Sequence, residues 1–272
     1  MRRIAFINEK GGTCKTTLTV NVGAYLAQKG KRVLVVDLDT QGHAGKSLGL
    51  DVRTLSPNVF DLLSRDDLTV AEVARATAVP GLDVVPSNKA MSEFPVVVAH
   101  RTDRVRRLDR AMRGLEGYDF VLYDAPPSMG LTTLNIMVAC EEVVIPVALT
   151  YLGLDGCAEM VETVRKVQSE HQKPDLRIAM VIPTLYRNTA LADEILEKLK
   201  SYFPEELAST ALGFNVKIDE AQSHGKTIWD YAPTSPGAKM LKAIADELVG
   251  RAPARPRTRG EKRASDQPSV SS

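Results

Sequence analysis

A stretch near the N-terminus, NEKGGTCKTT (residues 8–17), carries the residue types of a phosphate-binding loop. The common form of this loop is G-x-x-x-x-G-K-[ST], in which backbone amides hold the phosphates, the lysine reaches the terminal phosphates and the hydroxyl binds Mg²⁺. Lys15 and Thr16 match the last two positions, but Glu9 and Cys14 stand where the two glycines belong. The stretch therefore predicts nucleotide chemistry in a loop of unusual form.

The segments on either side place this loop between a strand and a helix. Residues 2–7 (RRIAFI) are a short apolar run typical of a buried strand, and TTLTVNVGAYLAQKG continues with apolar residues at helical spacing up to Gly30. A helix N-terminus offers free N–H groups to an anion, and Gly11 and Gly12 allow the chain to fold tightly around it. A purely structural glycine turn would not explain the Lys-Thr-Thr sequence that opens the helix.

Acidic residues end two further predicted strands. The strand at 32–36 is followed by Asp37 and Asp39, and the strand at 120–123 is followed by Asp124 and a Pro-Pro turn. Ligands of open α/β sheets lie beyond the carboxyl ends of the strands, and an aspartate there is the usual outer partner of Mg²⁺ in P-loop NTPases. For Asp37 alone, simple solvation of a strand end is the alternative interpretation.

The composition describes an ordinary globular chain. Its 272 residues, 44% hydrophobic and 25% charged, suit one α/β domain or at most two small ones. There is no apolar run long enough for a membrane span and no apolar core of a signal peptide at the N-terminus. Cys14, Cys140 and Cys157 are odd in number and irregularly spaced, which fits neither a disulfide framework nor a metal cage. We therefore expect a cytoplasmic protein that does not bind membranes.

Charge is unevenly distributed along the chain. The net charge is +1, yet residues 251–272 hold six arginines and lysines against two acidic residues, so residues 1–250 are slightly acidic. We expect an ATPase domain over 1–250 and a disordered basic tail over 251–272, because the tail is rich in Pro and Ser and lacks aliphatic periodicity. The tail either aids solubility or contacts nucleic acid. DNA binding by the domain itself would need a local basic patch.

Alternating strand and helix patterns predict an α/β fold with a mostly parallel, twisted sheet covered by helices on both faces, as in P-loop NTPases. The predicted strands lie at 3–7, 32–36, 82–85, 120–123, 142–147, 177–182 and 209–212. Further helices are predicted at 102–113, 131–140, 155–170, 191–203 and 236–249.

With these motifs the chain resembles the ParA/MinD group of deviant-Walker ATPases, and within it the Soj-like ParA partition ATPases. The family's K-G-G-x-x-K-T-T loop matches residues 10–17, and its D-x-D-P-Q-G motif resembles DLDTQG at 37–42. Its Y-D-x-[IV]-[IL]-x-D-x-P-P-S-L-G segment resembles 118–130, and its N-V-[RK]-x-x-E-A-x-S-x-G segment resembles the sequence from 215 onward. The resemblance extends from about residue 3 to 248.

The resemblance implies roles for individual residues. ATP and Mg²⁺ are the implied cofactors, with Thr16 and Asp124 as the metal-binding pair and Asp39 as the group that orients the attacking water. Lys15 acts within one subunit, whereas Lys10 is the signature lysine that crosses a nucleotide-sandwich dimer to the partner's phosphates, which accounts for the missing first glycine. The implied nucleotide-binding residues are Lys10, Gly11, Gly12, Thr13, Cys14, Lys15, Thr16, Thr17 and Asn215.

Some positions depart from the family pattern. Cys14 replaces the glycine before the Walker lysine, Thr40 and His43 replace a proline and an asparagine, and Gly-Phe at 213–214 stands where the family often has Pro-Arg. The helix N-terminus and Lys15 would favour a Cys14 thiolate, whereas bound ATP would oppose it. Redox control and inert packing of this thiol both stay open.

The function implied by the resemblance is that of an ATP-dependent molecular switch. ATP creates a homodimer, the dimer binds DNA without sequence preference, and a ParB-like partner stimulates hydrolysis, which segregates or positions a chromosome, a plasmid or another cargo. Such a protein is nucleoid-associated. We expect the DNA contacts at Lys217 and Lys226, with Arg187 as a weaker third.

Two other functional classes are alternatives. A MinD-like, membrane-associated positioning ATPase needs a C-terminal amphipathic helix with a bulky apolar face, and residues 251–272 contain no Leu, Ile or Phe. A reductase like the nitrogenase iron protein needs two cysteines presented at the dimer interface, whereas Cys140 and Cys157 fall in predicted helices. The MinD-like class is kept as the alternative.

Overall fold

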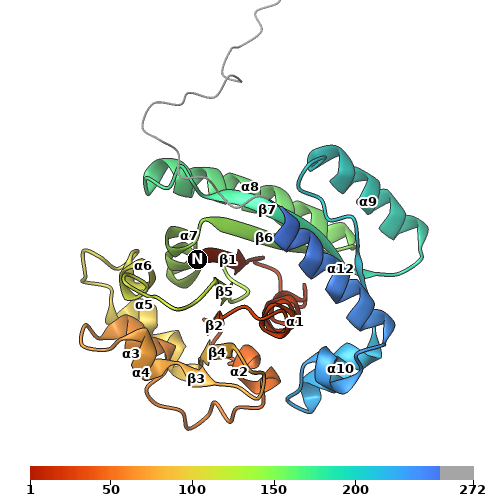
Figure 1. Ribbon diagram of the computed structural model, residues 1–272. Helices are drawn as coiled ribbons and strands as arrows, with labels where there is room; N and C mark the ends of the chain where they lie inside the picture. The colour runs from red at the N-terminus through yellow and green to blue at the C-terminus, as the bar shows by residue number, and fades with distance from the viewer. Residues whose placement is uncertain (252–272) are drawn as a thin grey trace, which may run out of the picture.

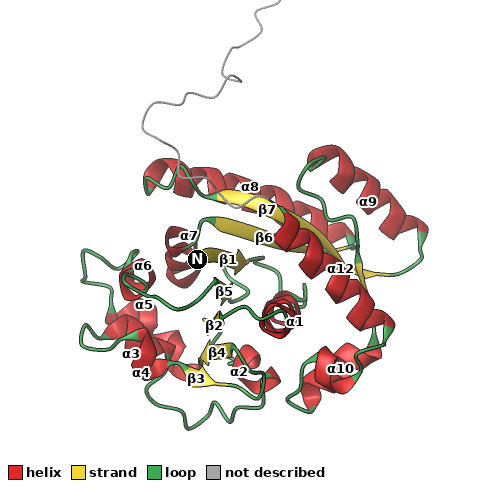
Figure 2. Ribbon diagram, viewed as in Figure 1, coloured by secondary structure: helices red, strands yellow, loops and turns green. Residues whose placement is uncertain are grey.

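The computed structural model describes residues 1–251, except for the side chains of Leu152 and Asp155. The predicted basic tail at 251–272 lies outside the described residues, apart from Arg251. Within them the chain forms an eight-stranded sheet of order β3-β4-β2-β5-β1-β6-β7-β8, in which all neighbouring strands are parallel except β3 and β4. Helices cover both sides of this sheet (Figures 1 and 2). The predicted mostly parallel α/β architecture is confirmed.

The strands follow the sequence pattern closely, with differences at the two edges of the sheet. β3 pairs with β4 as a two-residue antiparallel edge strand that is too short to show any periodicity. At the other edge β7 runs on to Tyr186, and the strand predicted at 209–212 is reduced to β8. The strands are β1 (Arg2–Phe6), β2 (Val33–Asp37), β3 (Arg75–Ala76), β4 (Leu82–Val85), β5 (Phe120–Asp124), β6 (Glu142–Ala148), β7 (Arg177–Tyr186) and β8 (Leu212–Gly213).

The helices fill the intervals between the strands. Helices α1, α2, α10, α11 and α12 pack on one face of the sheet and α3 to α9 on the other. They are α1 (Lys15–Gln28), α2 (His43–Ser47), α3 (Val59–Ser64), α4 (Val70–Val73), the 3₁₀ turn η1 (Lys89–Glu93), α5 (Phe94–Val97), α6 (Arg107–Ala111), α7 (Leu131–Ala139), α8 (Tyr151–Glu170), α9 (Ala190–Tyr202), α10 (Val216–Ser223), α11 (Ile228–Tyr231) and α12 (Pro236–Gly250).

Alternating side chains of the central strands bury both faces of the sheet. In β1, Ile4 and Phe6 pack into the cluster under α1 and α12, whereas Ala5 and the following Ile7 pack into the cluster under α7 and α8. Successive side chains of a strand point to opposite faces, so a strand that is apolar at every position needs helices on both sides. Figure 1 shows α1 and α12 on the side of the sheet opposite α6 and α7.

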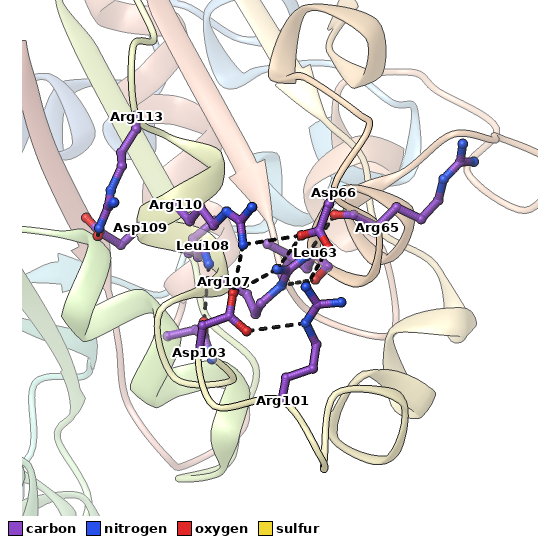
Figure 3. Close-up of polar contacts among 11 residues, drawn as sticks. Leu63, Arg65, Asp66, Arg101, Asp103, Arg107, Leu108, Asp109, Arg110 and Arg113 are labelled. Carbon is purple, nitrogen blue, oxygen red and sulfur yellow. Dashed lines mark hydrogen bonds and ion pairs between the residues drawn. The ribbon is translucent and has the colours of Figure 1, made fainter.

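The helix predicted at 102–113 is wrong in extent, because only α6 (Arg107–Ala111) forms. A network of arginines and aspartates holds the preceding segment in turns (Figure 3). The buried Arg107 donates to Leu63 O, Arg65 O, Asp66 and Asp103, at 2.7 to 2.9 Å. These side-chain bonds stabilise a non-helical path that sequence periodicity does not reveal.

The described helices include none that is both long and apolar enough to cross a bilayer.

Candidate nucleotide-binding site

Three adjacent strands bring the predicted residues to one edge of the sheet. β5 lies between β1 and β2, and Asp124 at its end is in register with both Phe6 and Asp37. The loop after β1 and the acidic residues after β2 and β5 therefore meet at the carboxyl edge, as expected for an open α/β sheet. A pocket of about 710 Å³ opens there. It is lined by residues 11–17, Asp39, Gln41, His43, Lys46, Ser47, Pro127, Leu185 and, from the C-terminal part, residues 212–215, Ile218, Asp219, Gln222 and Ser223.

The loop has the backbone conformation that a nest of amides requires. Gly12 (φ 73°) and Cys14 (φ 67°) both lie in the left-handed region. A Cβ at Gly11 or Gly12 would meet no atom within 4 Å, so the concave side of the loop is open rather than filled by neighbouring groups. The left-handed φ of residue 14 explains why related loops usually have glycine before the Walker lysine. Cys14 adopts it at a cost of about 1–2 kcal/mol.

Lys15 is the cation that the phosphate-binding loop contributes to the pocket. The residue is only 7% exposed, and its Nζ donates to Lys10 O at 3.0 Å, so the ammonium lies against the loop that precedes it. Burial lowers the pKa of Lys15, and the carboxylates of Asp124 and Asp39 oppose that effect. A desolvated ammonium at a helix N-terminus is well placed to bind phosphate oxygens.

Thr16 and Asp124 form a direct pair at the start of α1. Thr16 Oγ1 donates to Asp124 Oδ2 at 2.7 Å, and Thr19 Oγ1 lies 3.5 Å from Asp124 Oδ1. Burial raises the pKa of Asp124 to about 7, with a lowering contribution from the Thr16 hydrogen bond and a raising one from Asp39. Residues 1–251 contain no cluster of three or more acidic, His or Cys side chains that would hold a metal alone. A hydroxyl and one carboxylate suit Mg²⁺, which keeps waters and takes phosphate ligands.

The two aspartates after β2 have different surroundings. Asp37 is fully buried, and its carboxylate accepts from the backbone N–H groups of Asp39 (3.1 Å), Ala44 (3.0 Å) and Gly45 (3.3 Å). Burial, and then the nearby Asp124, raise the pKa of Asp37 well above its usual value. Asp39 is half-buried, lines the pocket and accepts from Gln41 N at 3.0 Å. Asp37 therefore anchors the N-terminus of α2, and Asp39 faces the ligand space.

Lys10 does not line the pocket of its own chain. Its backbone N–H donates to Asn8 Oδ1 at 2.9 Å, and its side chain runs along α8, where a Cβ on Gly156 would lie 3.3 Å from Lys10 Cε. The adjacent Glu9 also borders α8, and the Glu159 carboxyl beside it raises the pKa of Glu9. The charge of Lys10 is thus separated from that of Lys15, on the side of the loop toward α8.

Cys14 is a thiol rather than a thiolate. Burial raises its pKa to about 11, the Asp219 carboxylate adds to this, and the hydrogen bond with Thr184 and the charge of Lys15 only partly oppose it. Lys15 does favour the thiolate, as expected, but desolvation is the larger effect and favours the thiol.

The C-terminal part of the pocket is built around the start of α10. Asn215 is the N-cap of this helix and its Oδ1 accepts from Lys217 N at 3.1 Å, while the preceding Phe214 is 53% exposed and lines the pocket. Sequence motifs did not indicate Gln222, whose Nε2 donates to Thr17 Oγ1 at 3.0 Å. The sequence could have indicated Gln222 only through the helical spacing of Asp219, Gln222 and Ser223, which places these polar residues on one face of a helix.

The three cations predicted to contact DNA are all exposed. Lys217 lies on α10 and pairs with Glu220 at 2.7 Å, and Lys226 follows in the turn between α10 and α11. Arg187 lies after β7, with its guanidinium 5.5 Å from the ring centre of Phe214. Lys217 and Lys226 thus lie at and just after helix α10, and Arg187 contacts Phe214, which comes shortly before that helix.

The chain is similar to known proteins over nearly its whole described length. A family model described as an AAA domain matches residues 1–178. The sporulation initiation inhibitor protein Soj of Bacillus subtilis is 40% identical over 248 residues, covering 90% of this chain and 97% of that protein. The chromosome-partitioning ATPase Soj of Thermus thermophilus is 39% identical over 252 residues, covering 92% and 96%.

A solved structure shows the same fold with a nucleotide. Cobyrinic acid a,c-diamide synthase from Mycobacterium smegmatis, with bound ATP analog and magnesium, superimposes with a TM-score of 0.80. It is 30% identical to this chain, and the alignment covers 92% of this chain and 94% of that one. Together with the loop, the two acidic strand ends and the Soj relatives, this shows that the chain belongs to the ParA/MinD family of deviant-Walker P-loop ATPases, in its Soj/ParA group.

Proposed function

We propose that the chain is an ATP-dependent molecular switch of the ParA type that drives the segregation or positioning of a chromosome, a plasmid or another cargo. The observation that carries this proposal is the arrangement of Lys15 and the Thr16–Asp124 pair at a left-handed loop beside an open pocket. The Soj relatives, one of which bears the name of a chromosome-partitioning ATPase, support it. The cofactors are ATP and Mg²⁺, in keeping with the nucleotide and magnesium bound by the Mycobacterium smegmatis structure.

Each part of the pocket has a distinct task. The amides of residues 11–17 and Lys15 would bind the phosphates, and Thr16 and Asp124 would hold Mg²⁺. Bound Mg²⁺ supplies charge neutralisation at the phosphates. Asp39, which faces the pocket from the loop after β2, orients the attacking water. Phosphoryl transfer depends mainly on such positioning and neutralisation.

Lys10 acts across a homodimer. Its side chain lies along α8 outside the pocket of its own chain, so it is available to the phosphates of a second subunit packed against this face. Dimer formation then depends on ATP, because each nucleotide would be bound by groups from both chains.

The dimer binds DNA non-specifically and a ParB-like partner stimulates its hydrolysis, which places the protein on the nucleoid. Lys217, Lys226 and Arg187 are exposed cations grouped around α10, close to the pocket. Dimerisation doubles this surface, and affinity for DNA rises with the number of phosphates neutralised. ATP would therefore control DNA binding, because it produces the dimer and the dimer presents twice as many cations to the DNA phosphates.

The division of labour between the two lysines tests the proposal. We expect Lys15→Ala to lower ATP affinity by about 10²-fold or more, since a hydrogen bond to a charged group contributes about 1.5–3 kcal/mol and the neutralising charge is lost too. Lys10→Ala should bind ATP as a monomer but form no ATP-dependent dimer. Nucleotide titration and light scattering with ATP and Mg²⁺ measure the two effects. A Lys10→Ala chain that dimerises normally would contradict the role across the dimer.

A further inference from the structure

A second pocket, of about 580 Å³, lies beside the loop that carries Asp39. Three cations line it: Lys46 from the last turn of α2, Arg53 from the segment after α2, and Lys89 from the start of η1. Their side chains converge from three separate segments of the chain on one hollow, whose mouth is exposed to solvent.

These cations are not neutralised by their surroundings. All three residues are exposed, and within residues 1–251 none of them forms an ion pair. Other exposed lysines of this chain, such as Lys217 and Lys242, are paired with a carboxylate at 2.7 and 2.6 Å. The Asp51 carboxylate accepts from the backbone N–H of Arg53 at 3.3 Å, but it forms no ion pair with the Arg53 side chain. Cations that border one pocket without side-chain ion pairs repel one another, and a bound anion would relieve that repulsion.

The basic pocket shares a wall with the nucleotide pocket. Gln41 and Lys46 line both of them, and Thr40 lines the basic pocket directly after Asp39. Gln41 is bound to Asp39 through its backbone N–H at 3.0 Å. A change in the position of Asp39 would therefore move the next two residues, Thr40 and Gln41, which line the basic pocket.

The pocket is also continuous with the proposed DNA surface. Helix α2 packs against α10 (Figure 1). The segments that follow the two helices also meet, because a Cβ on Gly225 would lie 2.9 Å from Gly49 Cα and 3.3 Å from Lys46 O. The next residue after Gly225 is Lys226. The backbone of Lys46 and the residue before Lys226 therefore share one close contact, which joins the segment of the basic pocket to the segment of the proposed DNA surface.

We infer that the pocket lined by Lys46, Arg53 and Lys89 binds backbone phosphate of DNA, and that it extends the DNA surface of α10 across the loop that senses the nucleotide. This inference rests on the proposed function. Its chemistry is that of phosphate contacts, which position a protein on DNA without reading the sequence. Because the two pockets share a wall, this phosphate contact would depend on the nucleotide bound in the same subunit. That dependence would add to the effect of dimerisation, which doubles the number of cations presented to DNA.

The test compares two variants with the same change in charge. Arg53→Ala/Lys89→Ala removes two cations of the basic pocket that have no part in the nucleotide pocket. Lys29→Ala/Lys31→Ala is the matched control, because both of its residues are exposed, form no ion pair within residues 1–251 and lie beyond the far end of α1, about 20 Å from the phosphate-binding loop. DNA binding with ATP and Mg²⁺ is measured for each over a range of salt concentrations, on two duplexes of unrelated sequence.

We expect the pocket variant to lower the slope of log K against log salt by about 1.8, at about 0.9 per lost contact, equally on both duplexes. ATP affinity without DNA and ATP-dependent dimerisation should equal those of the control. Saturating DNA should raise the ATP affinity of the wild-type chain, by linkage, and raise that of the variant by a smaller factor.

Each other outcome overturns the inference in a recognisable way. A pocket variant that binds DNA like the control shows that the pocket is not a phosphate contact. If DNA binding is normal but stimulation by the partner protein is lost, the occupant is an acidic group of that partner. A wild-type chain that does not bind DNA with ATP contradicts the proposed function itself, before either variant is compared.

Discussion

The two aspartates after β2 provide a sharp test of how this site is built. Asp37→Ala leaves three backbone N–H groups without their acceptor, those of Asp39, Ala44 and Gly45. Each buried unpaired amide costs about 1–3 kcal/mol, and removal of the carboxyl group, whose pKa burial raises, offsets part of that loss. We expect a net loss of about 2–4 kcal/mol in the free energy of unfolding, a large part of the stability of a typical domain.

Asp39→Ala should behave in the opposite way. Its carboxylate faces the pocket and accepts from the exposed Gln41, so the free energy of unfolding should change by less than about 0.5 kcal/mol. ATP binding and dimerisation should persist while hydrolysis falls by about 10²-fold or more, because loss of positioning alone has costs of that order.

Urea unfolding followed by the fluorescence of Trp229, the single tryptophan, gives the stabilities, and release of phosphate gives the turnover. The tryptophan is a suitable probe because its Nε1 donates to Asn21 O of α1 at 2.9 Å and its ring lies 5.3 Å from that of Tyr25. Asp37→Asn is the matched control, since it removes the charge but keeps one acceptor oxygen, and it should lose less stability than Asp37→Ala. Wild-type stability in Asp37→Ala, or normal turnover in Asp39→Ala, would refute the assignment.

Two other predictions concern the loop and the DNA surface. With a pKa of about 11, Cys14 is almost wholly protonated at pH 7, so its alkylation should be slow and should accelerate tenfold per pH unit until about pH 11. A plateau of the alkylation rate below pH 9 would contradict this. The buried Cys140 and Cys157 should stay unreactive in the folded protein. Lys217→Ala/Lys226→Ala should weaken ATP-dependent DNA binding with a salt slope lower by about 1.8 and unchanged dimerisation, whereas deletion of residues 252–272 should weaken binding only modestly. Abolition by the deletion together with normal binding by the double variant would make the tail the DNA-binding element.

The sequence was sufficient wherever the determining interactions are local. The strand, loop and helix around Lys15 follow from apolar periodicity and a helix-opening Lys-Thr-Thr, and the meeting of Thr16 with Asp124 follows from the rule that parallel strands end at one edge. The roles of Asp37 and Gln222 were not predictable in this way. Two of the three amides that Asp37 binds belong to α2, which at five residues is too short to show a period. Gln222 meets Thr17 across 205 positions of sequence.

Helix α2 is the element through which nucleotide and DNA would be linked. At its start it is held by the buried Asp37 carboxylate, which also binds the N–H of Asp39. Lys46 lies in its last turn, and Gly49, two residues after the helix, packs closely on Gly225. A Cβ on Gly225 would lie 2.9 Å from Gly49 Cα, and a Cβ on Gly49 would lie 3.2 Å from Gly225 O. Backbone-to-backbone contact of this kind transmits displacement, because packed segments are not continuously deformable. The loop that carries Asp39, the residues of the basic pocket and the start of the α10–α11 turn are therefore joined by a continuous path of contacts, along which the proposed switch would act.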